Sequence, residues 1–177
     1  MLKMKNSPEH IIKLSKLKLS LMFVGSIGFV ALGVFFLITP DQFINSRMRS
    51  EEVIFTTGLA SILFFGLVGG FIGWKLFDTR PGLILTKEGF IDNSSGVSAG
   101  FVKWDDIQEV HTMQVASTKM ILLITRNPED YINLQSSKFK QRLMRINLKS
   151  YGTPLTLTSN GLQCSFQELY DLIEDGL

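Results

Sequence analysis

Hydrophobic positions follow two different patterns along the chain. Residues 19–39 and 53–74 are long apolar runs without a charged side chain, whereas from residue 80 onward the apolar runs are short and separated by polar turns. A helix rises about 1.5 Å per residue, so each long run can cross a hydrocarbon core roughly 30 Å thick. We therefore predict two transmembrane helices over these runs and a separate folded domain over residues 80–177.

The long runs fit a soluble core helix or a signal peptide less well. Buried core helices of this length would need a larger soluble shell than a chain of 177 residues can supply. A cleaved signal peptide would have a shorter apolar region and a small-x-small cleavage site, which the first run lacks. Membrane-spanning helices remain the better interpretation.

Basic residues are distributed unevenly around the two runs. The segment ahead of the first run contains five lysines: Lys3, Lys5, Lys13, Lys16 and Lys18. Lys75 and Arg80 follow the second run, whereas the connector 40–52 holds two arginines beside three acidic residues. Because cytoplasmic loops carry the excess of Lys and Arg, we predict a multi-pass plasma-membrane protein with both chain ends in the cytoplasm and the connector outside.

The basic segment 1–18 has its own helical signals. Ser7 is placed as an N-cap and Pro8 as the first helical residue. The apolar residues that could then face the bilayer are Ile11, Leu14 and Leu17. Neighbouring lysines can extend their ammonium groups to the headgroups. The pattern predicts an interfacial helix that extends the first span.

Small residues are spaced for close helix packing in both runs. The second run contains two overlapping GxxxG spacings, Gly66 with Gly70 and Gly69 with Gly73. The first run has a small-residue stripe formed by Gly25, Ser26 and Gly33. Such residues let helix backbones approach closely in lipid. We favour packing of the two spans as a hairpin, with a homodimer through the Gly-rich span as the alternative.

The domain alternates short strand and helix signals. Strands are predicted at 82–86, 90–92, 101–104, 107–115, 119–125 and 153–158, with the strand at 119–125 central because it is the most apolar. Gly89 is expected to supply a positive φ in the turn 87–89, and 93–100 is expected to be a flexible connection. Helices are predicted at 128–131, at 137–150 and after a capping box of Ser165 and Glu168.

Two motifs in the domain resemble a known family. Residues 85–90, "LTKEGF", and 102–107, "VKWDDI", are followed by two strands and a closing amphipathic helix. This arrangement resembles the bacterial pleckstrin-homology-like (PH-like) domain. It is also similar to small, uncharacterised bacterial two-span membrane proteins that have this domain and a late Gly152-Thr153-Pro154 turn. The resemblance implies an α+β inner-membrane protein: an N-terminal transmembrane hairpin, then a PH-like small β-barrel or sandwich with a C-terminal capping helix and a helical insert at about 127–151.

The tetrapeptide Trp104-Asp105-Asp106-Ile107 has two interpretations. As a structural corner, Trp104 would close one end of the barrel, one of the two aspartates would cap a single helical turn, and Ile107 would re-enter the core. As a metal site, the two carboxylates would need further ligands. Glu109 and His111 are near in sequence, but on a strand they share one face and diverge from the turn. The corner is therefore the interpretation that we favour.

The predicted helix at 137–150 is strongly basic. Phe139, Leu143 and Ile146 fall on one helical face, which we expect to pack on the barrel. The remaining surface carries the candidate lipid- or partner-binding residues Lys138, Lys140, Arg142, Arg145 and Lys149. Such a surface is often only solvated. Beside an anionic leaflet, each of these cations would contribute about 1 kcal/mol of attraction.

Composition and motifs narrow the functional classes. Basic and acidic residues nearly balance, at 18 and 16, so the charge does not indicate a nucleic-acid partner. The sequence has a single cysteine, Cys164, and contains no P-loop, G-x-S-x-G, H-E-x-x-H or CxxC motif, so we expect no cofactor and no enzyme activity.

Three functional hypotheses remain. The leading hypothesis is a non-enzymatic bacterial inner-membrane protein that presents a cytoplasmic domain to another protein or to lipid. One alternative is an immunity protein that neutralises a secreted bacterial toxin, because small two-span proteins often have this role. The other is a membrane-bound enzyme that would use Asp105, Asp106 and His111.

Overall fold

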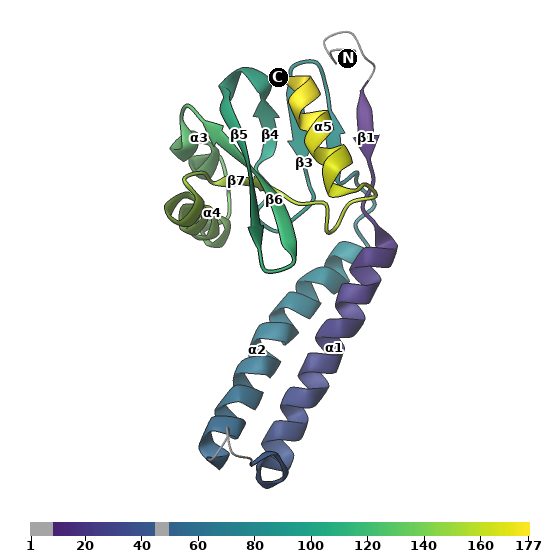
Figure 1. Ribbon diagram of the computed structural model, residues 1–177, viewed down its shortest axis with the longest axis vertical. Coiled ribbons are helices and arrows are strands. Elements are labelled where there is room, and N and C mark those ends of the chain that lie inside the picture. The colour runs from purple at the N-terminus through teal and green to yellow at the C-terminus, as the bar shows by residue number, and fades with distance from the viewer. Residues whose placement is uncertain (1–8, 45–49) are drawn as a thin grey trace. The chain divides into compact units, whose positions relative to one another are not determined.

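The chain folds into two units, one inserted into the sequence of the other (Figure 1). The computed structural model describes residues 9–44 and 50–177. The first unit, the domain, combines the segment before Lys16 with Thr79–Leu177, and the second unit, the hairpin, is Lys16–Asp78. The domain is therefore built from both sides of the hairpin in the sequence.

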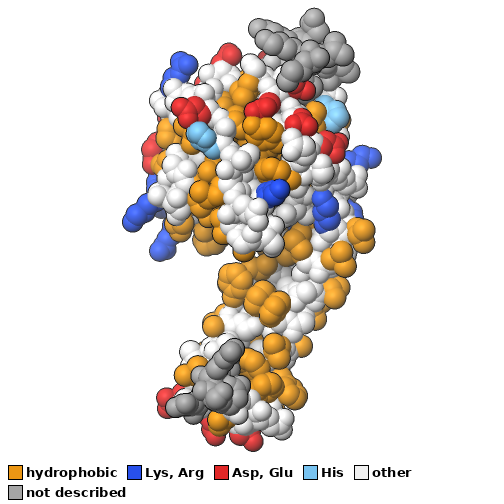
Figure 2. Space-filling view, viewed as in Figure 1, with side chains coloured by type: hydrophobic (Ala, Val, Ile, Leu, Met, Phe, Trp, Pro, Cys, Tyr) orange, Lys and Arg blue, Asp and Glu red, His pale blue; other side chains and the backbone are white. Residues whose placement is uncertain are grey.

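The hairpin consists of two long helices. Helix α1 spans Lys16–Ile38, the short 3-10 helix η2 spans Pro40–Phe43, and α2 spans Glu51–Leu76. Both α1 and α2 are long and apolar enough to cross a membrane. They cover residues 19–38 of the first run and all of the run 53–74, and apolar side chains are visible along the outer surface of the hairpin (Figure 2).

Close backbone contacts hold α1 and α2 together. A Cβ atom on Gly33 would lie 2.8 Å from the carbonyl oxygen of Gly58, and one on Gly58 would lie 2.7 Å from that of Gly33. The hydroxyl of Ser61 also donates a hydrogen bond to the carbonyl of Phe29 across the interface, at 3.0 Å. Only a hydrogen atom fits at the glycine crossing, so it sets the distance between the helices.

The two GxxxG spacings of α2 face in different directions. A side chain on Gly69 would meet Ser26 of α1, and one on Gly73 would meet the ring of Phe23. Within the described residues, Gly66 and Gly70 have nothing within 4 Å of such a side chain. The predicted intramolecular packing therefore uses the Gly69–Gly73 pair, whereas the homodimer through this span stays a prediction.

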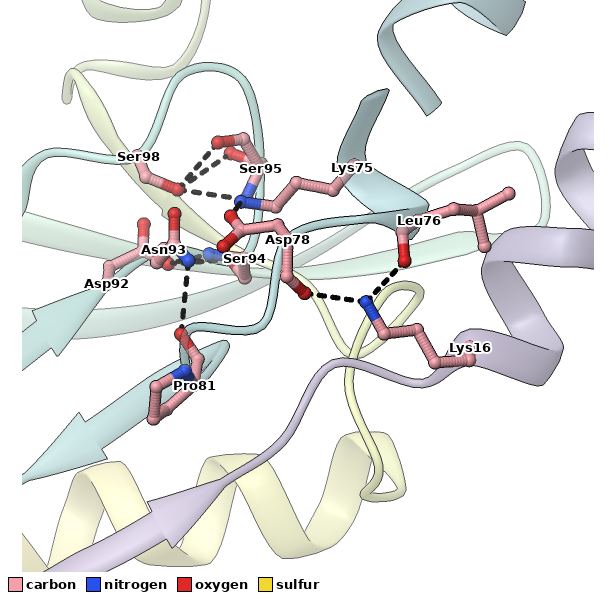
Figure 3. A network of polar contacts seen from close by, with 10 residues as sticks. All are labelled: Lys16, Lys75, Leu76, Asp78, Pro81, Asp92, Asn93, Ser94, Ser95 and Ser98. Carbon is pink, nitrogen blue, oxygen red and sulfur yellow. Dashed lines mark hydrogen bonds and ion pairs between the residues drawn. The ribbon is translucent and has the colours of Figure 1, made fainter. Parts of the chain in front are cut away.

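Polar contacts close the hairpin where α1 begins and α2 ends (Figure 3). The ammonium group of Lys16, at the start of α1, donates to the carbonyl oxygens of Leu76 at 2.7 Å and Asp78 at 2.6 Å. Lys75 forms an ion pair with Asp78 at 2.9 Å. A cation at a helix C-terminus satisfies carbonyls that lack an intrahelical partner. Lys16 thus links the beginning of the hairpin to its end.

The segment ahead of α1 is a strand and not the predicted interfacial helix. Strand β1, His10–Ile12, pairs antiparallel with β2, Leu83–Leu85. Ile12 and Leu14 are 4% and 3% exposed, and Leu14 forms a bridge with Leu162. Ser7 and Pro8, on which the helix prediction rested, lie outside the described residues. The prediction fails for the described part of this segment because pairing with β2 overrides the local helical signals.

The domain contains two antiparallel sheets. The first has the order β1-β2-β3-β4, and the second has the order β5-β6-β7. The remaining strands are β3 Gly89–Asp92, β4 Gly100–Lys103, β5 Ile107–Val115, β6 Thr118–Thr125 and β7 Leu155–Leu157. Neither sheet closes on itself among the described strands, so the domain is not a closed barrel. Strand β6 is central in its sheet, as predicted from 119–125.

Three helices complete the domain. Helices α3 (Pro128–Asn133) and α4 (Lys138–Tyr151) form the predicted insert between β6 and β7. Helix α5, Phe166–Gly176, begins with the predicted capping box of Ser165 and Glu168. The mixed α+β architecture with a C-terminal helix is therefore confirmed.

The core lies between the two sheets. Phe90 and Val102 of the first sheet line one interior space with Leu123, Leu155 and Leu157 of the second. Leu169 and Ile173 of α5 are fully buried as well. The two sheets therefore share an apolar interior, and α5 adds buried side chains to the domain.

Gly89 is required for a different reason from the one predicted. Among the described residues only Ala116, Gly100 and Gly152 have a positive φ, so the expected conformation of Gly89 is wrong. A Cβ at Gly89 would overlap the carbonyl oxygen of Val102 in the neighbouring strand β4. Glycine is needed here because two backbones approach closely.

Two adjacent isoleucines distinguish the strand β1 from an interfacial helix. Ile12→Ala should lower the free energy of unfolding of the full chain in detergent by about 2–5 kcal/mol, because Ile12 is buried. Ile11→Ala is the matched control and should cost under about 1 kcal/mol, because Ile11 is 50% exposed. Chemical unfolding followed by circular dichroism measures both. A helix that places Ile11 in the bilayer and Ile12 in solvent would give the opposite order.

Candidate interaction surface

Trp104 lies at the turn between β4 and β5, but the described sheets form no closed barrel whose end it could close as predicted. It begins a short 3-10 helix, η3 (Trp104–Asp106), between β4 and β5. The indole is 7% exposed, and its Nε1 donates a hydrogen bond to the carbonyl of Thr86 at 2.9 Å. Its ring lies 5.1 Å from that of Phe90, and a Cβ on Gly176 would overlap it. Trp104 therefore connects the β2–β3 turn, the core and the last turn of α5.

The two aspartates of the corner do not have the predicted capping role. The N-cap of η3 is Lys103, and no side chain caps this turn. Asp106 instead accepts a hydrogen bond from the hydroxyl of Tyr131 in α3, at 2.7 Å, and Asp105 is exposed. Burial, and next the hydrogen bond to Asp106, raise the pKa of Tyr131 to about 12. Asp106 thus joins the corner to the helical insert.

Strand β5 lies at the edge of its sheet and is largely exposed. Ile107 is half-buried, so it does not enter the core as predicted. Glu109 and His111 share one face of β5 and bond to each other at 2.8 Å in solvent. In the described parts of the chain, no group of three His, Cys, Asp or Glu side chains is placed to hold a metal ion.

The segment 93–100 is ordered by hydrogen bonds around a buried carboxylate (Figure 3). The Oδ1 atom of Asp92, which is 5% exposed, accepts hydrogen bonds from the backbone N–H of Ser94 at 2.8 Å and from its hydroxyl at 2.6 Å. Ser98 accepts a hydrogen bond from the N–H of Ser95 at 2.8 Å. These side chains supply hydrogen bonds where the segment has no strand partner, and the predicted flexibility of the connection stays a prediction.

Burial sets the charge behaviour of Asp92. Removal from water raises the pKa of its carboxyl group, while the hydrogen bonds from Ser94 and Ser98 and the charge of Lys140 oppose the shift. Lys140 is half-buried, unlike the other basic residues of α4. Sequence reasoning missed this site, although an Asp two residues before a Ser is a usual signal for a side-chain-capped turn.

Helix α4 packs on the domain through a face that differs from the predicted one. Phe139 and Ile146, expected in the interface, are 71% and 52% exposed, and Leu143 is half-buried. Met144 is fully buried in their place. The inward position of Gln141 is fixed by a hydrogen bond to the carbonyl of Gln135, at 2.7 Å. The prediction assigned all three apolar residues to the packing face, whereas the helix is turned so that Met144 faces the domain.

The outward side of α4 therefore combines cations with apolar side chains. We call it the α4 outer face and define it by Lys138, Phe139, Arg142, Arg145, Ile146 and Lys149, to which Leu134, 76% exposed just after α3, is adjacent in sequence. Of the five predicted cations, Lys140 lies apart from this face. Arg145 contacts Glu129 at 3.5 Å and Asn133 at 3.2 Å. Figure 2 shows basic side chains at the edge of the domain that carries α4.

Comparisons with known proteins identify no relative of this chain. The chain matches no protein-family model, no curated protein and no solved structure. Inferences about function therefore rest on the residues and their geometry.

The corner and metal interpretations of the WDDI segment predict different stabilities. Trp104→Ala should lower the free energy of unfolding by about 3–5 kcal/mol, because a buried ring and its hydrogen bond are lost. Asp105→Asn should change it by no more than about 0.5 kcal/mol, because Asp105 is exposed. Thermal unfolding with and without Mg²⁺ or Mn²⁺ completes the test. Stabilisation by metal that disappears in Asp105→Asn would contradict the corner.

Asp92 should make the stability of the domain depend on pH. Its pKa in the folded state is raised above its ordinary value of 3.8. Between the unfolded-state pKa and this higher folded-state pKa, the folded chain binds more protons than the unfolded chain. Stability must then fall as the pH rises through this window. Asp92→Asn carries no such charge, so its stability relative to wild type should increase over the same window and level off above it.

The measurement is chemical unfolding of both chains at several pH values from acidic to neutral. Asp105→Asn is the control, and its difference from wild type should not follow the Asp92 curve, because Asp105 is exposed. If the difference in free energy of unfolding between Asp92→Asn and wild type stays constant with pH, burial does not raise the pKa of Asp92.

Proposed function

We propose that the chain is a non-enzymatic inner-membrane protein of bacteria whose hairpin anchors a cytoplasmic PH-like interaction domain. Exposed apolar side chains along both helices support the membrane assignment. They include Leu21, Val24, Phe29, Phe35, Leu63, Phe64 and Leu67, each at least 49% exposed. Water disfavours such a surface, whereas a hydrocarbon core accepts it.

The pairing of β1 with β2 is the observation that carries the proposed topology. These strands lie on either side of the hairpin in the sequence and belong to one sheet. If the helices cross a bilayer, both of their domain ends must therefore emerge on the same side. The lysines before α1 and the basic residues after α2 favour the cytoplasm as that side.

The PH-like assignment is supported by the location of its two motifs. "LTKEGF" forms the β2–β3 turn and "VKWDDI" forms the corner after β4. The hydrogen bond from Trp104 to Thr86 joins these motifs directly. Helix α5 follows the second sheet and packs its last turn against Trp104, as a C-terminal capping helix would. The α4 outer face provides this domain with a surface for interaction.

Fusions to reporters test both parts of the topology. A reporter that is active only in the periplasm should be silent before Met1 and after Leu177, and active within the connector 40–52. Different results at the two chain ends would contradict the β1–β2 pairing. Activity at both ends with silence in the connector would preserve the fold and contradict the cytoplasmic assignment alone.

A further inference from the structure

The α4 outer face has an unusual content of exposed apolar surface. Leu134 and Phe139 are the two most exposed large apolar side chains in the described part of the domain, and Ile146 is also more than half exposed. Within α4, Met144 is the buried residue, and Phe139 and Ile146 stay in solvent. Large apolar side chains in contact with water along one helix face indicate a surface that is covered by something else.

The charges on this face indicate what covers it. Its four cations are Lys138, Arg142, Arg145 and Lys149, and the α4 sequence contains no acidic residue. Like charges at positions i and i+4, such as Lys138 with Arg142, repel each other along a helix. Glu129 contacts only Arg145 of this set. An anionic partner would remove the repulsion among the remaining cations.

A lipid surface matches both properties at once. Anionic headgroups attract each cation, and the acyl boundary below them accepts apolar side chains such as Phe139. The chain also keeps the domain near such a surface, because only residues 13–15 and 77–82 separate the hairpin helices from β1 and β2. This tethering gives a high effective concentration, so weak contacts are sufficient.

We propose that the α4 outer face docks on the anionic lipid headgroup layer of the membrane that holds the hairpin, with Phe139 and Ile146 entering the interface between headgroups and acyl chains. The proposal rests on the proposed function, because it requires the hairpin to be inserted. The cations supply a salt-dependent attraction, and the apolar side chains set the depth of contact.

The experiment places a polarity-sensitive fluorophore on the face in the full chain. Phe139→Cys and, separately, Ile146→Cys are made with Cys164→Ser, and each labelled chain is reconstituted in nanodiscs. One set of nanodiscs contains phosphatidylcholine alone, and the other also contains phosphatidylglycerol. Lipids with a quencher at the acyl boundary report contact. Both probes should show blue-shifted emission and stronger quenching in the anionic nanodiscs.

Salt and charge reversal identify the origin of the contact. Raising salt from 0.1 M to 1 M shortens the Debye length from ~10 Å to ~3 Å, so the extra quenching should be lost. Lys138→Glu with Arg142→Glu should abolish it, while circular dichroism stays that of the parent. Lys87→Glu with Lys103→Glu makes the same change in net charge at exposed positions outside α4, and it should leave the quenching intact.

Several results would overturn the proposal. Quenching that is the same in both lipids, or that persists in 1 M salt, would exclude an electrostatic attraction to anionic headgroups. Probes that ignore lipid and respond only to added soluble cell extract would assign the face to a protein partner. Failure of the proposed function is separate, because a chain that does not insert into nanodiscs and is extracted by alkaline carbonate would have no membrane hairpin.

Discussion

The pairing of β1 with β2 is the constraint on which the rest of the structure depends. It joins two segments that are separated by the whole hairpin and places them in one sheet. The chain must therefore leave the domain and return to it at neighbouring strands. Two helices packed side by side satisfy this requirement. The Gly33–Gly58 crossing sets their separation, and Lys16 binds the end of α2 to the start of α1.

Trp104 has an equivalent role inside the domain. Each sheet has few strands, so neither can form a core alone, and contacts between them must come from large side chains and from α5. Trp104 lies where the chain passes from the first sheet to the second. It contacts Phe90, bonds to Thr86 and packs against Gly176 at the end of α5. Asp106, in the same turn, extends the connection to Tyr131. The turn at Trp104 therefore contacts elements that are distant in sequence.

Features with local causes could be predicted from the sequence, and features with distant causes could not. The two long helices follow from apolar length, and the start of α5 follows from a capping box within four residues. Strand β1 could not be predicted, because its partner β2 follows the hairpin. The need for glycine at position 89 depends on the carbonyl of Val102 in another strand. The orientation of α4 could not be predicted either, because a helical wheel shows which residues share a face but not which face packs against the domain.

The orientation of α4 determines both the surroundings of Asp92 and the composition of the α4 outer face. Lys140 lies on the half-buried side of α4, where its charge lowers the pKa of Asp92 against the larger effect of burial. Met144 is buried one turn further along the same side. A rotation of α4 that buried Phe139 and Ile146 would turn Met144 outward and carry Lys140 away from Asp92. The inward contacts of Met144 and Lys140 therefore go together with the exposure of Phe139 and Ile146, and the cations and apolar residues that remain outside form the surface available to a partner.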